Sequence, residues 1–422
     1  MGANSRRDLL SKKLTELERL SEVVTKLDAH YGFYLLKNCF SLPKLLYFLR
    51  TSACFEEVDL LNRYDSIVRK SLAKICNVNF SENSYTQATL PVSRGGIGIA
   101  SASQIALPAF LASATGAKCA LSCILPENYV DASFEKALSL WLGKSNLSEA
   151  PSDFIQKHWT SPLADVILDQ LITDLDAENV RRLNAYQDPF GSAWLNVVPS
   201  KNLGLKLTDQ QLRISLSLRL GAKICEKHTC RCGKLVEENG HHGLSCTRSA
   251  GRFSRHHNLN VLVKQALSSI KVPSVLEPNG LTRSDGKRPD GITLAPWEEG
   301  KQLVYDVTSV DLLAPSRIEN GSVANPGTAA EEAEARKMTK YECIIDKGYI
   351  FQPLAFETQG GVGPSTSTFL KMLCKKLCVC NQESRAGSFF KQRLSLAIQA
   401  GNAASVVGTV RDEDHLSELY YL

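Results

Sequence analysis

Charged side chains between residues 277 and 341 have the types and spacing that metal-assisted phosphodiester hydrolysis requires. That chemistry needs two or three carboxylates that converge on Mg²⁺, and a cation that offsets the charge building on the phosphate. Glu277 and Asp290 could supply carboxylates. Asp306 is the most telling acid because it lies within the apolar run LVYDV, where a carboxylate is costly unless it is paired or binds a metal.

The cation could come from a helix predicted over residues 329–344. Glu334, Lys337 and Tyr341 share one face of this helix by three- and four-residue spacing, and Lys340 lies beside them. Taken singly, the residues have simpler explanations, since Asp290 could cap a turn and the lysines could form a solvated helix face. The order E…PD…D…K-x-x-K-Y favours an active site.

Residues 221–250 are dense in cysteine, histidine and glycine. Thiolate and imidazole are typical zinc ligands, and a segment with so few apolar residues would take its folding energy from the metal. The alternative is a set of free thiols in a turn. The spacing leaves open which four residues bind Zn²⁺ among the candidates Cys225, Cys230, Cys232, His241, His242 and Cys246.

A basic helix start follows this segment directly. Arg252, Arg255, His256 and His257 lie at the beginning of a helix predicted over Arg252–Ile270. Basic side chains and free backbone N–H groups at a helix start are natural phosphate contacts, so we expect DNA binding there. A solvated helix end is the alternative.

The elements that must position these residues alternate in type. After the helix come short β-like runs over Pro273–Glu277, Arg288–Leu294 and Gln302–Val310. A polar loop over residues 314–328, the helix 329–344, a further strand and two closing helices follow. Residues 1–220 are mainly helical in pattern. We therefore predict an α+β chain: an all-helical N-terminal region, a small zinc knuckle, and an α/β core in the order α-β-β-β-α-β. The predicted domains are 1–125, 126–220, 221–250, 251–400 and a tail, 401–422.

Bulk composition agrees with a folded protein of two or three domains. The chain has 422 residues, of which 43% are hydrophobic and 22% charged, and a net charge of +5 that suits nucleic acid only if it is clustered. The opening segment lacks the apolar core of a signal peptide, so the 13 cysteines indicate a reducing compartment and metal binding rather than disulfides. The apolar stretch 105–125 contains Pro108, Gly116 and Lys118, which predicts buried helices and no membrane span.

The motifs CRCGKLVEENGHHGLSC, GRFSRHH, LEP, KRPDG, LVYDVT and RKMTKY resemble the C-terminal part of open reading frames from non-LTR retrotransposons of the restriction-like-endonuclease class. The resemblance implies a Cys/Cys/His/Cys knuckle followed by a PD-(D/E)XK endonuclease. Asp290 and Asp306 would be Mg²⁺ ligands, Glu277 a third acid, and the motif lysine would be Lys337 or Lys340. Thr308 stands where that lysine usually lies, which is consistent with its migration onto the helix.

The same resemblance implies a function. Such proteins nick double-stranded DNA in the nucleus, and the released 3′ end primes reverse transcription of the element's RNA. The segments SLPKLLYFLRT and LPVSRGGIGI are similar to the thumb and post-thumb region of the polymerase. Nothing before residue 220 offers the polymerase's paired aspartates, so we expect no polymerase activity.

Two alternatives come from other classes of protein. In the first, the chain is a catalytically dead, zinc-dependent nucleic-acid-binding relic, which binds and never cuts. In the second, it is a non-catalytic assembly module with the same fold. The second alternative predicts that Asp290, Asp306 and Lys337 do not converge in space.

Overall fold

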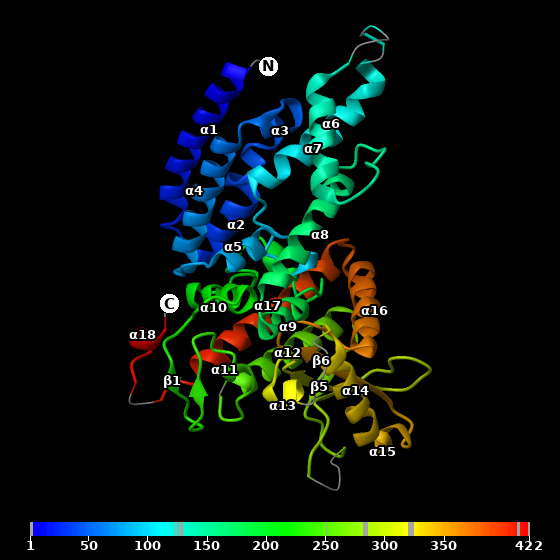
Figure 1. Cartoon of the computed structure of the whole chain (residues 1–422). Coiled ribbons are helices and arrows are strands. Elements are labelled where there is room, and N and C mark those ends of the chain that lie inside the picture. The colour runs from blue at the N-terminus through cyan, green and yellow to red at the C-terminus, as the bar shows by residue number, and fades with distance from the viewer. Residues whose placement is uncertain are drawn as a thin grey trace. The chain divides into compact units, whose positions relative to one another are not determined.

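The computed structural model describes residues 3–121, 123–124, 126, 130–249, 251–281, 286–319, 325–411 and 414–420. The chain divides into two compact units, Met1–Ala177 and Glu178–Leu422. Figure 1 shows their helices and strands along the chain. The predicted α+β class and the helical N-terminal region are both confirmed.

All regular elements in the described residues of the first unit are helices. Leu10, Leu14 and Leu17 recur at helical spacing on its first helix and are buried there, which is why that segment folds as an amphipathic helix. The helices are α1 (Ala3–Val24), α2 (Ala29–Leu35), α3 (Leu46–Thr51), α4 (Val58–Cys76), α5 (Glu82–Thr89), α6 (Ala102–Leu121), α7 (Ala132–Ser145) and α8 (Gln156–Asp174).

Side chains from one helix secure the next in this unit. Asp65 of α4 accepts hydrogen bonds from the backbone N–H groups of Ala102 and Ser103, at 2.6 and 3.1 Å, and so satisfies the free donors at the start of α6. The indole N–H of Trp141 donates to the carbonyl oxygen of Trp159 at 2.9 Å, and both rings are buried. None of the described helices is long and apolar enough to cross a membrane.

The second unit contains all the strands of the described chain. Its helices are α9 (Ala177–Ala185), α10 (Asp209–Leu220), α11 (His242–Ser245), α12 (Gly251–Ser269), α13 (Pro315–Glu319), α14 (Thr328–Lys340), α15 (Glu342–Ile345), α16 (Pro364–Asn381), α17 (Ala386–Val407) and α18 (Leu416–Leu419). Its strands are β1 (His228–Thr229), β2 (Leu235–Val236), β3 (Ser274–Leu276), β4 (Gly291–Thr293), β5 (Leu303–Val310) and β6 (Ile350–Glu357).

A four-stranded sheet in the order β3-β4-β5-β6 forms the centre of this unit in the described part of the chain. The β3–β4 and β4–β5 pairs are antiparallel, whereas β5 and β6 are parallel. A parallel pair needs a long connection, and here that connection contains α14. The predicted order of helix, three strands, helix and strand is therefore present.

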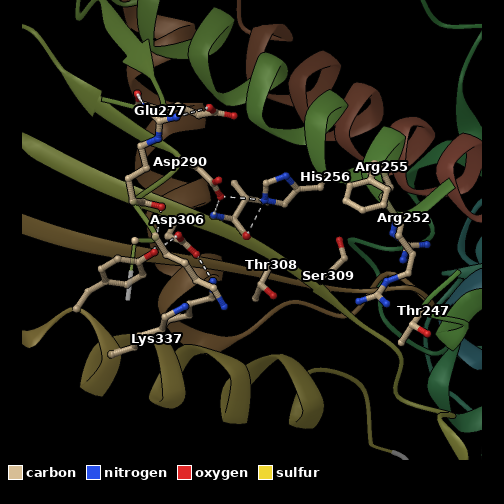
Figure 2. Close-up of a pocket in the computed structure, with 17 residues that line it drawn as sticks. Thr247, Arg252, Arg255, His256, Glu277, Asp290, Asp306, Thr308, Ser309 and Lys337 are labelled. Carbon is tan, nitrogen blue, oxygen red and sulfur yellow. Dashed lines mark hydrogen bonds and ion pairs between the residues drawn. The ribbon is translucent and has the colours of Figure 1, made fainter. Parts of the chain in front are cut away.

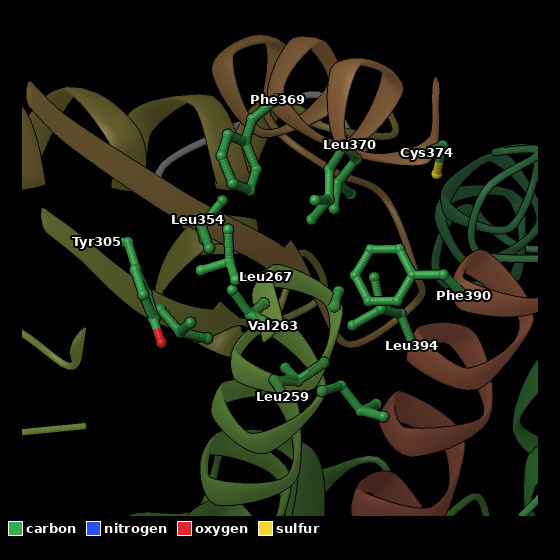
Figure 3. Packing of buried hydrophobic residues seen from close by; sticks show 14 of the residues in the cluster. Leu259, Val263, Leu267, Tyr305, Leu354, Phe369, Leu370, Cys374, Phe390 and Leu394 are labelled. Carbon is green, nitrogen blue, oxygen red and sulfur yellow. The ribbon is translucent and has the colours of Figure 1, made fainter. Parts of the chain in front are cut away.

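The two faces of β5 meet different layers. Leu303, Tyr305 and Val307 point to a core shared with α12, α16 and α17, and Val304 points the other way, toward Tyr341. Figure 3 shows the first core, in which α12 presents its leucines to β6 and α16. Burial on both faces explains why the buried part of β5, residues 303–307, is apolar apart from Asp306.

Two buried glutamates fix α14 in place. Glu357, at the end of β6, accepts hydrogen bonds from the backbone N–H groups at the start of α14, from Gly327 (2.9 Å), Ala329 (2.9 Å) and Ala330 (3.2 Å). Glu334 accepts from the backbone N–H of Thr366 at 2.7 Å and so joins α14 to the start of α16. The helix predicted as one piece ends at residue 340, and α15 follows it.

Predicted segment limits and observed elements differ at further places, and the boundary between the two units falls inside the predicted segment 126–220. The predicted boundary at residue 400 falls inside α17, and the Cys/His segment packs on α10 and on the end of α17. The predicted polar loop 314–328 contains α13, and its residues 320–324 lie outside the described chain.

Candidate functional site

The strand register places three acids side by side. Gly291 of β4 is opposite Tyr305 of β5, so the preceding residue, Asp290, lies opposite Asp306. Leu276 is opposite Gly291 on the other side, and the next residue, Glu277, donates its backbone N–H to the carbonyl oxygen of Asp290 at 2.8 Å. Glu277, Asp290 and Asp306 therefore form one row across three strands.

Gly291 makes this register possible. A Cβ atom at Gly291 would lie 2.2 Å from Cζ of the Tyr305 ring, which is closer than any real contact. Tyr305 is fully buried, so its ring has no room to move aside. The glycine after Asp290 therefore lets β4 and β5 approach and brings Asp290 next to Asp306.

Asp306 is buried between a lysine and a tyrosine of the opposite layer. Lys337 of α14 forms an ion pair with Asp306 Oδ2, and the Tyr341 hydroxyl donates to Asp306 Oδ1 at 2.7 Å. Burial raises the pKa of Asp306 and the nearby Asp290 carboxylate raises it further, although Lys337 and Tyr341 oppose the rise. A divalent cation would relieve this repulsion, and carboxylate oxygens suit Mg²⁺.

Asp290 is oriented by two donors at one of its oxygens. Oδ2 accepts the backbone N–H of Val307 at 2.7 Å and lies 3.0 Å from Nε2 of His256, which is also 3.2 Å from the Val307 carbonyl oxygen. The hydrogen bond to Asp290 raises the pKa of His256. His256 was predicted as a phosphate contact; the structure places it on a candidate metal ligand.

The side chain of Glu277 lies at the edge of this row. Its carboxylate is 71% exposed and forms an ion pair with Arg288 at 3.5 Å. The backbone of Glu277 has a φ of +48°, which is unusual for a residue with a side chain. In Figure 2, Glu277 lies above Asp290, farther from Lys337 than Asp306 is.

The two candidate lysines have different surroundings. Both lie over the ring of Tyr341, with Nζ 5.9 Å (Lys337) and 5.6 Å (Lys340) from the ring centre, but the ion pair with Asp306 is formed by Lys337. Both line the same cleft. The structure thus brings together Asp290, Asp306 and Lys337, the three residues that an assembly module would leave apart.

A cleft of about 680 Å³ contains the acids at one end. Thr308 and Ser309 of β5 line the cleft between the Asp306–Lys337 end and the Arg252–Thr247 end (Figure 2). Basic residues line it on several sides, and they are Arg252, Arg255, His256, Lys287, Arg288, Lys337 and Lys340. The net charge of +5 suits nucleic acid only if basic residues are clustered, and in this cleft they are clustered.

The arginines at the start of α12 point into different environments. Arg252 is exposed on the cleft wall. Arg255 is 2% exposed, and its guanidinium donates to Asn402 of α17 at 2.7 Å. Its buried position differs from the solvent-facing one that a phosphate contact requires, because α17 approaches closely at Gly401.

Four of the six predicted zinc ligands converge. A tight turn between β1 and β2 carries Cys230 and Cys232, and the short helix α11 carries His242 one turn before Cys246. The ligand atoms of these four residues all lie within 4.8 Å of one another. Gly233, with a φ of +87°, closes the turn, a conformation that a glycine adopts without strain.

The distances fit a tetrahedral ion. Cys230 Sγ and Cys246 Sγ are 3.7 Å apart, too far for a disulfide and close to the roughly 3.8 Å between two thiolates on one zinc. Cys232 Sγ lies 3.2 Å from Nε2 of His242. Burial lowers the pKa of His242, which favours the neutral imidazole that binds zinc. The Cys₃His cluster could therefore hold Zn²⁺.

The other two candidates lie outside this cluster. Cys225 is buried, and its Sγ donates to the carbonyl oxygen of Glu237 at 3.4 Å. Burial lowers the pKa of His241 to about 4, and its side chain is not part of the cluster. The structure thus narrows the six candidate zinc ligands to Cys230, Cys232, His242 and Cys246.

Sequence reasoning missed several cleft residues. Lys287 and Arg288 directly precede the Pro-Asp pair, so their position beside a candidate catalytic acid was a usable signal. Phe253 and Ser309 carried no such signal. No protein-family model matches the chain, and no curated protein matches its sequence.

Proposed function

We propose that this chain is a Mg²⁺-dependent DNA endonuclease of the PD-(D/E)XK type. The observation that carries the proposal is Asp290 beside Asp306, with Lys337 paired to Asp306, at the end of a basic cleft. The order α12-β3-β4-β5-α14-β6 supports an endonuclease-like core, because it is the α-β-β-β-α-β order that the sequence predicts for that core.

Asp290 and Asp306 would hold Mg²⁺, with Glu277 as the third acid. Bound Mg²⁺ would supply Lewis acidity toward the phosphate and an activated water. The protein's own groups prepare this site before DNA arrives. The Val307 N–H and His256 orient Asp290, and Tyr341 orients Asp306.

The cations of the cleft would bind the DNA backbone. Lys337 stands where negative charge would build on the scissile phosphate, and a fixed ammonium there stabilises that charge more than bulk water does. Arg252, Lys287 and Arg288 would contact neighbouring phosphates. Such contacts position the duplex and carry no sequence information.

The zinc cluster would position one end of the cleft. Thr247, the residue after Cys246, lines the cleft, and Arg252 follows five residues later. Zn²⁺ bound by the four ligands would therefore fix the segment that leads into α12. We further propose that the nick serves target-primed reverse transcription of a retrotransposon in the nucleus, with double-stranded DNA and element RNA as partners.

A supercoiled-plasmid nicking assay tests the activity. We expect zinc-loaded wild-type protein to produce open circles with Mg²⁺ and not with EDTA. Replacing Asp306 by alanine should slow nicking at least about a hundredfold, the effect that losing even one hydrogen bond to the transition state has in other enzymes. Asp346→Ala, an exposed acid outside the cleft, is the matched control and should nick normally.

Two results would contradict the proposal. Nicking by Asp306→Ala at the wild-type rate would remove Asp306 from the active site. A wild-type protein that shifts DNA in a gel, contains zinc and never cuts would be the catalytically dead binding relic.

A further inference from the structure

Phe253 is an exposed aromatic side chain in the wall of the cleft. It lies in the first turn of α12, and the residue is 77% exposed. Arg252 and His256 of the same helix line the same cleft. Because the fold buries little of the phenyl ring, the ring contributes little to stability and is accessible to a ligand.

The surroundings of Phe253 indicate which ligand. The other exposed side chains of the same cleft include its neighbour Arg252 and, beside the acids, Lys287 and Arg288, all of which suit phosphate groups. A flat apolar ring in a cleft that is also lined by cations suits a ligand that has both phosphates and flat aromatic faces. Nucleotides have both, and stacking of a base on an aromatic side chain tolerates any sequence.

We infer that Phe253 stacks on an unpaired base of the DNA that enters the cleft. The inference rests on the proposed function for the identity of the ligand as DNA. In an intact duplex, the neighbouring base pairs cover both faces of each base, so a ring on the cleft wall reaches a base only where the stack is opened. The substrate class is therefore DNA with unpaired nucleotides beside the cut.

The path between the acids and Phe253 is lined by hydroxyl groups. Ser309 lies three residues beyond Asp306 on β5, roughly 10 Å along the strand. The Ser309 hydroxyl is buried without a hydrogen-bond partner among the described residues, so a ligand oxygen could bond with it. A DNA strand that follows this path would meet α12 within a few nucleotides of the scissile phosphate.

A double-mutant cycle tests the stacking, with the wild-type chain and Phe253→Ala as the two proteins. The two DNAs are a duplex with a short single-stranded gap and the same duplex with abasic sites in place of the gap bases. Both DNAs carry the same phosphates and differ only in the unpaired bases, and comparison with Phe253→Ala isolates the part of that difference that depends on the ring. Binding is measured by fluorescence anisotropy without added Mg²⁺, so that cleavage plays no part.

We expect wild-type protein to bind the gapped duplex about tenfold more tightly than the abasic one, the effect of one stacked base. Phe253→Ala should not distinguish the two DNAs, and Phe253→Trp should restore the difference. Phe154→Ala, which removes a ring with 71% exposure outside the cleft, should behave as wild type.

Equal discrimination by wild-type protein and Phe253→Ala overturns the stacking. This result is independent of the nicking assay. Plasmid nicking without coupling between Phe253 and the gap bases would support the endonuclease and contradict the stacking. Coupling without any cleavage would support the stacking and contradict the endonuclease.

Discussion

The Cys/His cluster and the row of acids are assembled over very different lengths of chain. The candidate zinc ligands all lie between Cys230 and Cys246, on one turn and in or directly after one short helix. The row of acids needs three strands, and the groups that orient it come from α12 and α14. A local site can be recognised from spacing, whereas a dispersed site depends on the register of a sheet.

The two regions also differ in what stabilises them. The row of acids rests on a sheet whose core is filled by α12, α16 and α17. The cluster has a smaller core, in which Cys230 and Cys246 pack against Val406 of α17. We therefore expect the cluster to depend on its metal for folding, and the row of acids to fold without one.

Removing a zinc ligand should have the largest effect on stability. Structural zinc contributes about 10 kcal/mol or more in small zinc fingers, and α17 supplies part of the support here. Cys246→Ser should lose the zinc and roughly 3 kcal/mol or more of unfolding free energy, measured by metal analysis and urea unfolding. Cys380→Ser, an exposed thiol on α16, is the control and should keep both. Full zinc occupancy in Cys246→Ser would show that Cys246 is not a required zinc ligand, and would contradict the expected dependence of the cluster on these four residues.

Neutralising an acid of the row should have a smaller effect of opposite sign. The pKa of Asp306 is raised by burial, so its contribution to stability is present at low pH and declines as pH rises through its folded-state pKa. At neutral pH the protein must bury the ionised carboxylate, which costs free energy, and asparagine removes this cost. We therefore expect Asp306→Asn without Mg²⁺ to be as stable as wild type or more stable by about 1 kcal/mol at neutral pH.

Thermal unfolding with and without Mg²⁺ checks this expectation. Mg²⁺ should raise the Tm of wild-type protein and leave that of Asp306→Asn unchanged, because a ligand stabilises only the state that binds it. If Asp306→Asn is strongly destabilised without metal, Asp306 serves the fold, and the contrast with the cluster fails.

The smallest expected effect is the pH dependence that His256 contributes. Its hydrogen bond to Asp290 raises the pKa of His256, so its stabilisation is fully present below the unfolded pKa of about 6.5 and is lost as pH rises through the folded-state pKa. Between about pH 5.5 and about pH 8.5, wild-type protein should therefore lose slightly more stability than His256→Gln.

Urea unfolding at the two pH values measures the difference. The imidazole is 42% exposed, so solvent screens the pair and the effect stays small. His257→Gln, the exposed neighbour, should follow the wild-type profile. An identical profile for His256→Gln would show that the contact with Asp290 contributes nothing measurable.

Much of the second unit could be predicted because its elements have strong local patterns. The run Gln302–Val310 became β5, Leu303–Val310, and the helix Arg252–Ile270 became α12, Gly251–Ser269. Periods of 3.6 and 2 residues come from backbone geometry within each segment, so they need no knowledge of the rest of the fold. The split of the helix 329–344 before α15 was not predicted, since its helix formers continue through residue 344.

The sequence by itself determined the helices and strands, the acids and the set of zinc candidates. Only the tertiary structure decided which candidates meet. The strand register brings Asp290 beside Asp306, and packing makes Lys337 rather than Lys340 the ion-pair partner of Asp306. Cys225 and His241 lie outside the cluster. Arg252 and Arg255 show the physical reason, because two arginines on the same helix start differ only in what packs against them. That partner, α17, lies nearly 150 residues farther along the chain, where Asn402 binds Arg255.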